Sequence, residues 1–185
     1  MKFNKSMAIV VVILAIVFGG IYILSNQSNK AVLQRWNLDG LEVTEMVKVM
    51  DQTTYDLTQI NAGISGKELI ITDEVGEFRF ALPKDLFYLS FAPYIHETHP
   101  CANHNLVTCR GELPNQTFDV LITKSDGSVV LNETLTSFDN GFVGVWLDKG
   151  IEATIEVQYK GLVAHAMIST FETSDTCLTT PLQLQ

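Results

Sequence analysis

The chain is poor in the two residue types that carry much of metal and redox chemistry. It has three cysteines and four histidines in 185 residues. No two cysteines form a Cys-x-x-Cys pair, which counts against a thioredoxin-like oxidoreductase and against the common zinc sites. The sequence also lacks a Ser–His–Asp pattern, a phosphate-binding glycine loop and a catalytic pair of carboxylates. Hydrolase and nucleotide-binding functions are therefore not indicated.

Basic residues are also scarce, and two of them stand at the very start. Lys2 and Lys5 precede an uncharged run, and after residue 25 the ten remaining Lys and Arg oppose 21 Asp and Glu, a net charge of −11. Such a surface is a poor partner for nucleic acid, which binds basic patches. A cation is a reasonable partner for it.

The one long apolar run lies near the N-terminus. Residues 7–24 read "MAIVVVILAIVFGGIYIL" and carry no charge, which is long enough to span a bilayer, since roughly 17–25 residues are needed. The preceding lysines favour a cytoplasmic N-terminus. No A-x-A site follows, so we expect an uncleaved membrane anchor, with a cleaved signal peptide as the alternative. Residues after 25 are then extracytoplasmic, in the periplasm or on the outer face of the cell membrane, where disulfides form.

A polar linker and one amphipathic helix are expected next. Residues 26–40 are of mixed polar composition, and from Leu41 to Leu57 apolar residues recur at helical spacing. Thr44 or Asp39 is the expected N-cap. Met46 and Met50 lie on the apolar stripe and are expected to be core residues rather than metal ligands. The stripe needs a partner, which is a sheet or a second copy of the chain in a homodimer.

The rest of the chain alternates in the manner of β-strands. Turn signals separate the apolar runs, and residues 151–159 and 162–170 form the clearest hairpin. The expected strands are 68–72, 77–82, 87–95, 117–123, 129–135, 142–147, 151–159 and 162–170. The sequence thus predicts an α+β fold with three parts: an anchor or signal segment (1–25), a linker with a small helix and strand region (26–84), and an antiparallel β-sandwich-like domain (85–185).

The segment "THPCANHNLVTCRGEL", residues 98–113, holds two cysteines and two histidines. Cys101 and His104 are three residues apart, which places them side by side in a turn. Cys101 and Cys109 are eight apart and cooperate only if the segment folds back on itself. Cys177 can join them only through the fold.

Three functions remain open from this spacing. Thiolates and imidazoles suit zinc and copper, and three thiolates without an obvious fourth ligand match Cu(I) better than a structural zinc site. Thiols can also reduce Cu(II) and become a disulfide. The alternatives are a structural or interaction β module with one disulfide and one idle thiol, and a thiol–disulfide oxidoreductase.

A longer motif surrounds these residues and carries a resemblance to a known family. The motif comprises "FYLSFAPY" (87–94), Thr98, His99, Cys101, His104, Thr108, Cys109, Gly111 and Glu112. It resembles the signature of the CueP family of bacterial periplasmic copper-binding proteins, and the resemblance extends from about residue 35 to the end of the chain.

The resemblance implies a function and a set of ligands. Cys101, Cys109 and Cys177 would bind copper, and His99 and His104 match by position. The protein would serve copper resistance by buffering copper, by delivering it to a client cuproprotein, or by reducing Cu(II) with its thiols, which a thiol reductant would then restore. Any enzymatic activity would be at most that thiol-dependent reduction. The N-terminal region would mediate dimers.

Overall fold

The computed structural model describes residues 13–14, 29–53, 55 and 58–185. Apart from residues 13 and 14, the expected anchor (7–24) lies outside the described residues. Within the described part of the chain, no helix combines the length and apolar character needed to cross a membrane. The chain divides into two compact units, residues 1–41 and 42–185. In the first, residues 29–35 of the expected linker are helical; the second holds every candidate ligand.

The amphipathic helix predicted from Leu41 to Leu57 is present but shorter, as α2 (Val43–Gln52), and Thr53 at its C-cap is already extended. Its N-cap is Glu42 rather than Thr44 or Asp39, so that prediction was wrong. Glu42 and Glu45 form a capping box, in which the Glu45 carboxylate accepts the Glu42 N–H at 3.1 Å. This reciprocal arrangement satisfies two backbone donors of the first turn, which a threonine inside the helix cannot do. The buried stripe comprises Met46, Val47, Met50 and also Asp51.

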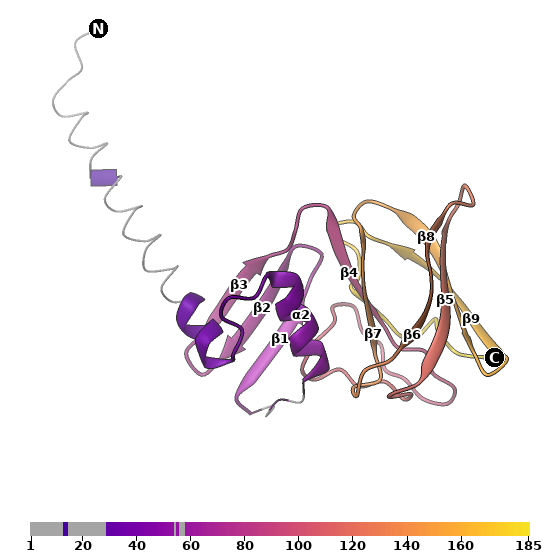
Figure 1. The fold of residues 1–185 in the computed structure, drawn as a ribbon, viewed down its shortest axis with the longest axis horizontal. Helices are drawn as coiled ribbons and strands as arrows, with labels where there is room; N and C mark the ends of the chain where they lie inside the picture. The colour runs from indigo at the N-terminus through magenta and orange to yellow at the C-terminus, as the bar shows by residue number, and fades with distance from the viewer. Residues whose placement is uncertain (1–12, 15–28, 54, 56–57) are drawn as a thin grey trace, which may run out of the picture. The chain divides into compact units, whose positions relative to one another are not determined.

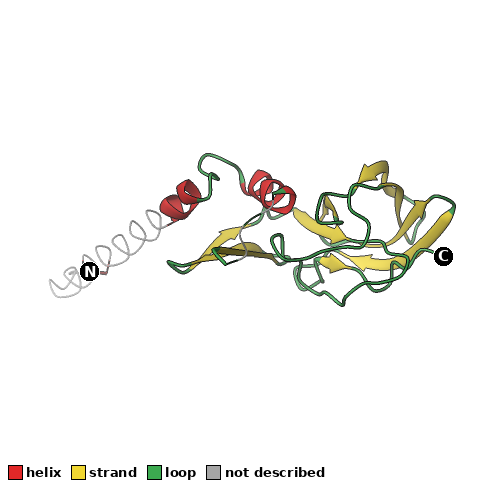
Figure 2. Ribbon diagram, turned by 90° about the horizontal axis from the view of Figure 1, so that it is seen from below, coloured by secondary structure: helices red, strands yellow, loops and turns green. Residues whose placement is uncertain are grey.

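A small antiparallel sheet precedes the sandwich. It consists of β1 (Ile60–Ile64), β2 (Glu68–Asp73) and β3 (Glu77–Ala81). Strands β2 and β3 confirm the strands predicted at 68–72 and 77–82. Strand β1, with the sequence INAGI, was not predicted. In both ribbon views α2 lies at the end of this sheet that is nearer the sandwich (Figures 1 and 2).

Two sheets form the sandwich. The first has the strand order β6-β5-β8-β9 and is antiparallel. Its strands are β5 (Thr117–Lys124), β6 (Val129–Thr136), β8 (Glu152–Tyr159) and β9 (Leu162–Ser169). The second has the order β10-β4-β7, with β4 (Leu86–Phe91), β7 (Val143–Asp148) and β10 (Cys177–Leu178). The expected sandwich is therefore present, but it is not wholly antiparallel, because β10 runs parallel to β4.

Strand β4 is buried on both faces and separates the core from the candidate site. Phe87, Leu89 and Phe91 join the sandwich core. Residues at alternate positions point to opposite faces of a strand, so Tyr88 and Ser90 face the other way, toward a second cluster that contains Ala92, Cys109, Phe142 and Cys177. The candidate site thus lies outside the sandwich core, against the outer face of β4.

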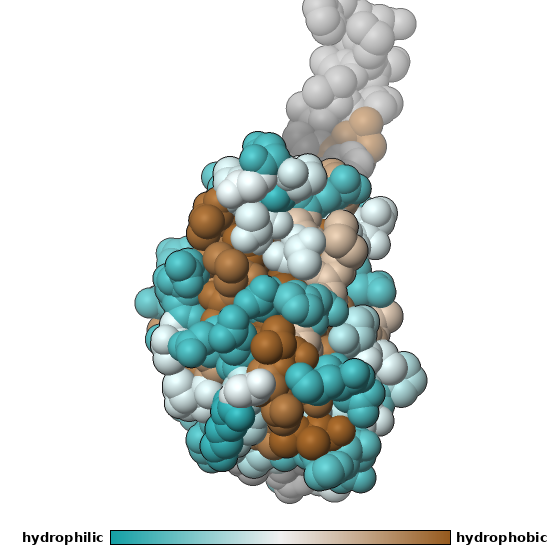
Figure 3. Space-filling model, turned by 90° about the vertical axis from the view of Figure 1, so that its right-hand side faces the viewer, coloured by the Kyte–Doolittle hydropathy of each residue, from teal (hydrophilic) through white to brown (hydrophobic). Residues whose placement is uncertain are grey.

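The end of the sandwich opposite the candidate site is partly apolar at its surface. Viewed from that end, brown apolar residues form a band between polar ones (Figure 3). Among the large apolar side chains exposed in this domain are Val129, Met167 and Phe171. They belong to β6, to β9 and to the segment after β9, none of which contributes a candidate ligand.

Candidate metal centre

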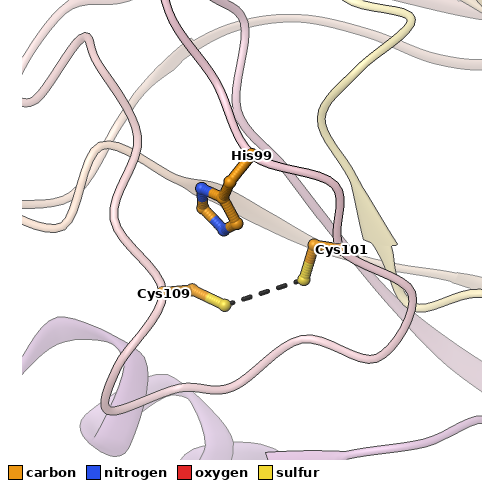
Figure 4. A group of neighbouring side chains, drawn as sticks. All are labelled: His99, Cys101 and Cys109. Carbon is orange, nitrogen blue, oxygen red and sulfur yellow. Dashed lines mark hydrogen bonds between the residues drawn. The ribbon is translucent and has the colours of Figure 1, made fainter.

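The segment between Cys101 and Cys109 folds back, which is the condition for the two cysteines to cooperate. The Asn105 side chain accepts the N–H groups of Val107 at 3.1 Å and Thr108 at 2.9 Å, an Asx turn. The Cys109 N–H donates to the Asn105 carbonyl at 3.1 Å. This tight turn brings the Sγ atoms of Cys101 and Cys109 to 3.7 Å (Figure 4).

Strand β1 fixes the turn in place. The Ile64 N–H donates to the His104 carbonyl at 2.9 Å, and the Leu106 N–H donates to the Ala62 carbonyl at 2.8 Å. Thr176, next to Cys177, accepts the His104 N–H at 3.0 Å and donates to the Ile64 carbonyl at 2.7 Å. The strand that sequence reasoning missed is therefore the one that positions His104.

Cys177 reaches the site through β10. It stands opposite Ser90 of β4, and its N–H donates to the Ala102 carbonyl at 3.0 Å. The hydroxyl of Thr179 donates to the His99 carbonyl at 2.6 Å. Cys177 forms a disulfide with Cys101, and Cys109 remains a free, buried thiol. As expected, Cys177 joins the others only through tertiary structure.

Gly111 and Glu112 of the motif support the loop rather than offering ligands. A Cβ atom at Gly111 would lie 2.6 Å from the Gly141 carbonyl oxygen, so the two backbones meet at a distance that no side chain permits. The Gly111 N–H donates to the Asn140 carbonyl at 2.7 Å. The Glu112 carboxylate accepts the N–H groups of Ile95 at 2.6 Å and His96 at 3.0 Å. These contacts hold both ends of the segment that carries the ligands.

All five predicted site residues come together, in two overlapping groups. His99, Cys101 and Cys109 form one group, and His104, Cys109 and Cys177 form the other, with the ligand atoms of each group within 4.8 Å of one another. In Figure 4 the His99 ring points toward the two sulfur atoms of its group. Soft sulfur with nitrogen is the donor set that copper and zinc accept.

Behind His104 lies a buried polar network that the sequence analysis did not anticipate. His104 Nε2 lies 2.9 Å from Asp51 Oδ1, and both side chains are inaccessible to solvent. The Asn140 amide donates to the same oxygen at 2.7 Å, and the Tyr88 hydroxyl donates to Oδ2 at 2.6 Å. His104 Nδ1 is 3.9 Å from Cys177 Sγ. The only sequence feature that could have marked Asp51 as a site residue is its position, one helical turn after Val47, on the apolar face of the helix.

This network changes the acidity of the groups in it. Burial alone would lower the pKa of His104, but hydrogen bonds with Asp51 and Cys109 outweigh it and raise that pKa to about 9. Burial raises the pKa of Cys109, but its interaction with His104 and the Asn105 N–H outweigh that effect and lower it. Burial, together with Asp51, raises the pKa of Tyr88 well above its ordinary value. Cys109 therefore forms its thiolate, the species that binds metal and attacks disulfides, at a lower pH than it would without His104.

The other two histidines lie apart from both groups. His96 is exposed, and its backbone N–H serves the Glu112 carboxylate. His165 stands opposite Glu156 on neighbouring strands, with Nδ1 3.6 Å from the carboxylate. His165 is therefore an interstrand partner on β9 and belongs to neither group.

The chain is similar to a known protein family and to a solved structure. The protein-family model described as "Periplasmic copper-binding protein CueP" matches residues 45–183, a range that contains Asp51 and all five candidate ligands. A solved structure described as "Crystal Structure of S.CueP" is 42% identical, with a TM-score of 0.81, and the match covers 85% of this chain and 98% of that chain. A search of the curated proteins found no match.

Proposed function

The chain belongs to the CueP family of periplasmic copper-binding proteins, and from this premise we propose that it binds Cu(I) outside the cytoplasm in the service of copper resistance. Cys101, Cys109 and Cys177 supply the thiolates, and His99 or His104 completes the coordination. The observation that carries the proposal is the convergence of three sulfurs from two distant segments, flanked by two imidazoles. Thiolates select Cu(I) over harder ions.

The same thiols can reduce Cu(II). Two Cu²⁺ ions each take one electron, two thiols lose two electrons and two protons, and the products are two Cu⁺ ions, one disulfide and two protons. The Cys101–Cys177 disulfide is the product such a reaction would leave. A dithiol reductant is then required to restore both thiols before the next cycle.

The acidic surface and the extracytoplasmic location suit a protein that binds copper and passes it to another protein. The net charge of −11 after residue 25 favours the approach of a cation. The apolar run at residues 7–24 would hold the chain at the membrane face if it is not cleaved. We therefore propose that the protein buffers copper and delivers it to a client cuproprotein.

The second candidate is a structural or interaction β module without metal. One disulfide and one buried free thiol, as found here, are also what that function requires. An idle thiol in an apolar site should have a raised pKa, whereas His104 lowers the pKa of Cys109. That difference favours the copper site. The low exposure of Cys109, 8%, counts against a third function, a protein thiol oxidoreductase.

Native mass spectrometry of the reduced full chain in detergent, with and without an equivalent of Cu(I), tests the proposal. We expect one copper per chain, lost when the thiols are alkylated beforehand. Two equivalents of Cu(II) should instead remove the mass of two hydrogens and produce two equivalents of Cu(I). If neither copper ion changes the mass, the structural module is the better explanation.

A further inference from the structure

The five candidate ligands form two sets of three, and the sets share a single atom. Cys109 Sγ belongs to both, whereas Cys101 and His99 belong to one and Cys177 and His104 to the other. Each set contains two sulfurs and one imidazole nitrogen. Each could therefore bind a Cu(I) ion by itself.

The sets differ in their access to solvent. His99 and Cys101 are half-buried, whereas His104 is fully buried and Cys177 is 3% exposed. His99 also lines a surface cavity of about 280 Å³, whose other lining residues are Glu97, Thr98, Arg110, Gly111 and Glu112. The set with His99 is thus the outer one, which an ion reaches first, and the set with His104 is enclosed.

The sets also differ in how firmly their imidazoles are held. Asp51 fixes the His104 ring at Nε2, and Phe142 packs against that ring at a centroid distance of 4.6 Å. Among the described residues, no hydrogen bond holds the His99 ring, and its centroid is 6.4 Å from that of Phe142. A ligand oriented in advance binds more tightly, because less conformational entropy is lost on binding. The inner set should therefore be the stronger one.

We propose that Cu(I) is captured by His99, Cys101 and Cys109 and then passes to Cys109, Cys177 and His104. Cys177 replaces Cys101 and His104 replaces His99, while Cys109 remains bound throughout, so the ion is not released between the two positions. The inference rests on the copper-binding function proposed above and adds to it a route with an outer and an inner position. In this route His99 governs uptake and His104 governs retention.

The first test measures the rate and the equilibrium of copper transfer separately. A coloured Cu(I)–bicinchoninate complex is mixed with the reduced full chain in detergent, and the loss of colour gives both quantities. His99→Gln should slow uptake about tenfold and leave the equilibrium affinity close to that of the unmodified protein. His104→Gln should lower the affinity by at least about tenfold, since loss of a mere supporting partner of a ligand typically costs 10- to 100-fold, and leave the initial rate unchanged. His165→Gln, on β9, is the control and should change neither.

A second pair of variants covers the case in which His104→Gln does not fold. Cys101→Ser and Cys177→Ser make the same chemical change and remove the same disulfide, so they are matched to each other. Cys101→Ser should take up copper slowly and retain it against excess chelator. Cys177→Ser should take it up fast and lose it to the chelator fast.

The outcomes separate this inference from the function on which it rests. If the unmodified chain takes up no Cu(I), the copper-binding function itself fails. If the chain binds Cu(I) but Cys101→Ser and Cys177→Ser show the same rates of uptake and loss, there is a single position and the route is wrong. Equal effects of His99→Gln and His104→Gln on the affinity would lead to the same conclusion.

Discussion

Asp51 and His104 form a buried carboxylate–imidazole pair, with Oδ1 and Nε2 2.9 Å apart. Asp51 lies in the last turn of α2, where the helix dipole disfavours a negative charge. Its position is therefore not explained by the stability of the helix. The pair holds the His104 ring with Nδ1 on the side of Cys177. Carboxylates orient metal-binding histidines in proteins in the same way.

Replacing Asp51 with Asn should weaken copper binding without removing a ligand. The amide is close in size but loses the charge that orients and polarises His104, so we expect the Cu(I) affinity to fall about 10- to 100-fold. Competition with a Cu(I) chelator measures it. Ser90→Ala is the control: Ser90 is buried two residues from Tyr88 on β4, and its hydroxyl has no partner among the described residues. An Asp51→Asn affinity equal to that of Ser90→Ala would contradict the prediction.

The pKa of the Cys109 thiol should be lower than that of an ordinary cysteine. In the protein with the Cys101–Cys177 disulfide, Cys109 is the free thiol, so the ultraviolet absorbance of thiolate against pH reports its pKa directly. His104 favours the thiolate and lowers this pKa, and the His104→Gln variant should shift the titration toward higher pH. An unchanged titration curve in that variant would show that His104 does not act on Cys109.

Gly111→Ala should destabilise the protein through a backbone clash. The new methyl would lie 2.6 Å from the Gly141 carbonyl oxygen and 2.9 Å from Ala92 Cβ, and overpacking of this kind costs roughly 1–3 kcal/mol. Urea unfolding measures the change in free energy. Gly63→Ala is the matched control, because a Cβ atom at Gly63 meets nothing within 4 Å; it should change stability by less than about 0.5 kcal/mol. Similar stabilities for the two variants would refute the close-approach explanation.

Oxidation should reduce the affinity of both proposed copper positions together. The Cys101–Cys177 disulfide removes one thiolate from each set of three, so the oxidised chain should bind Cu(I) at least about tenfold more weakly than the reduced one. A phosphine reductant should restore the affinity. In a double variant with serine at positions 101 and 177, the affinity should be low and independent of redox state. Equal Cu(I) affinities of the oxidised and reduced native chain would contradict this prediction.

Local sequence pattern was sufficient for most of the elements. The alternation of residues 151–159 is reproduced by β8, and the helical spacing from Val43 to Met50 is reproduced by α2. Both patterns reflect which face of a single element meets the core, and that information is local. Strand β1 escaped notice because INAGI contains an Asn and a Gly, which are depleted in strands. Strand β10 has two residues and no pattern of its own.

By itself, the sequence determined the candidate ligand types and the concentration of four of the five candidates in residues 98–113. It also showed that this segment must fold back if Cys101 and Cys109 are to cooperate. Only the tertiary structure decided that Cys177 pairs with Cys101, that Cys109 stays free, and that Asp51 supports His104. These contacts join residues 76 positions apart in the disulfide and 53 positions apart in the carboxylate–imidazole pair. They arise where α2, β1 and β10 pack around one loop. Periodicity describes each element singly and carries no information on which elements will meet.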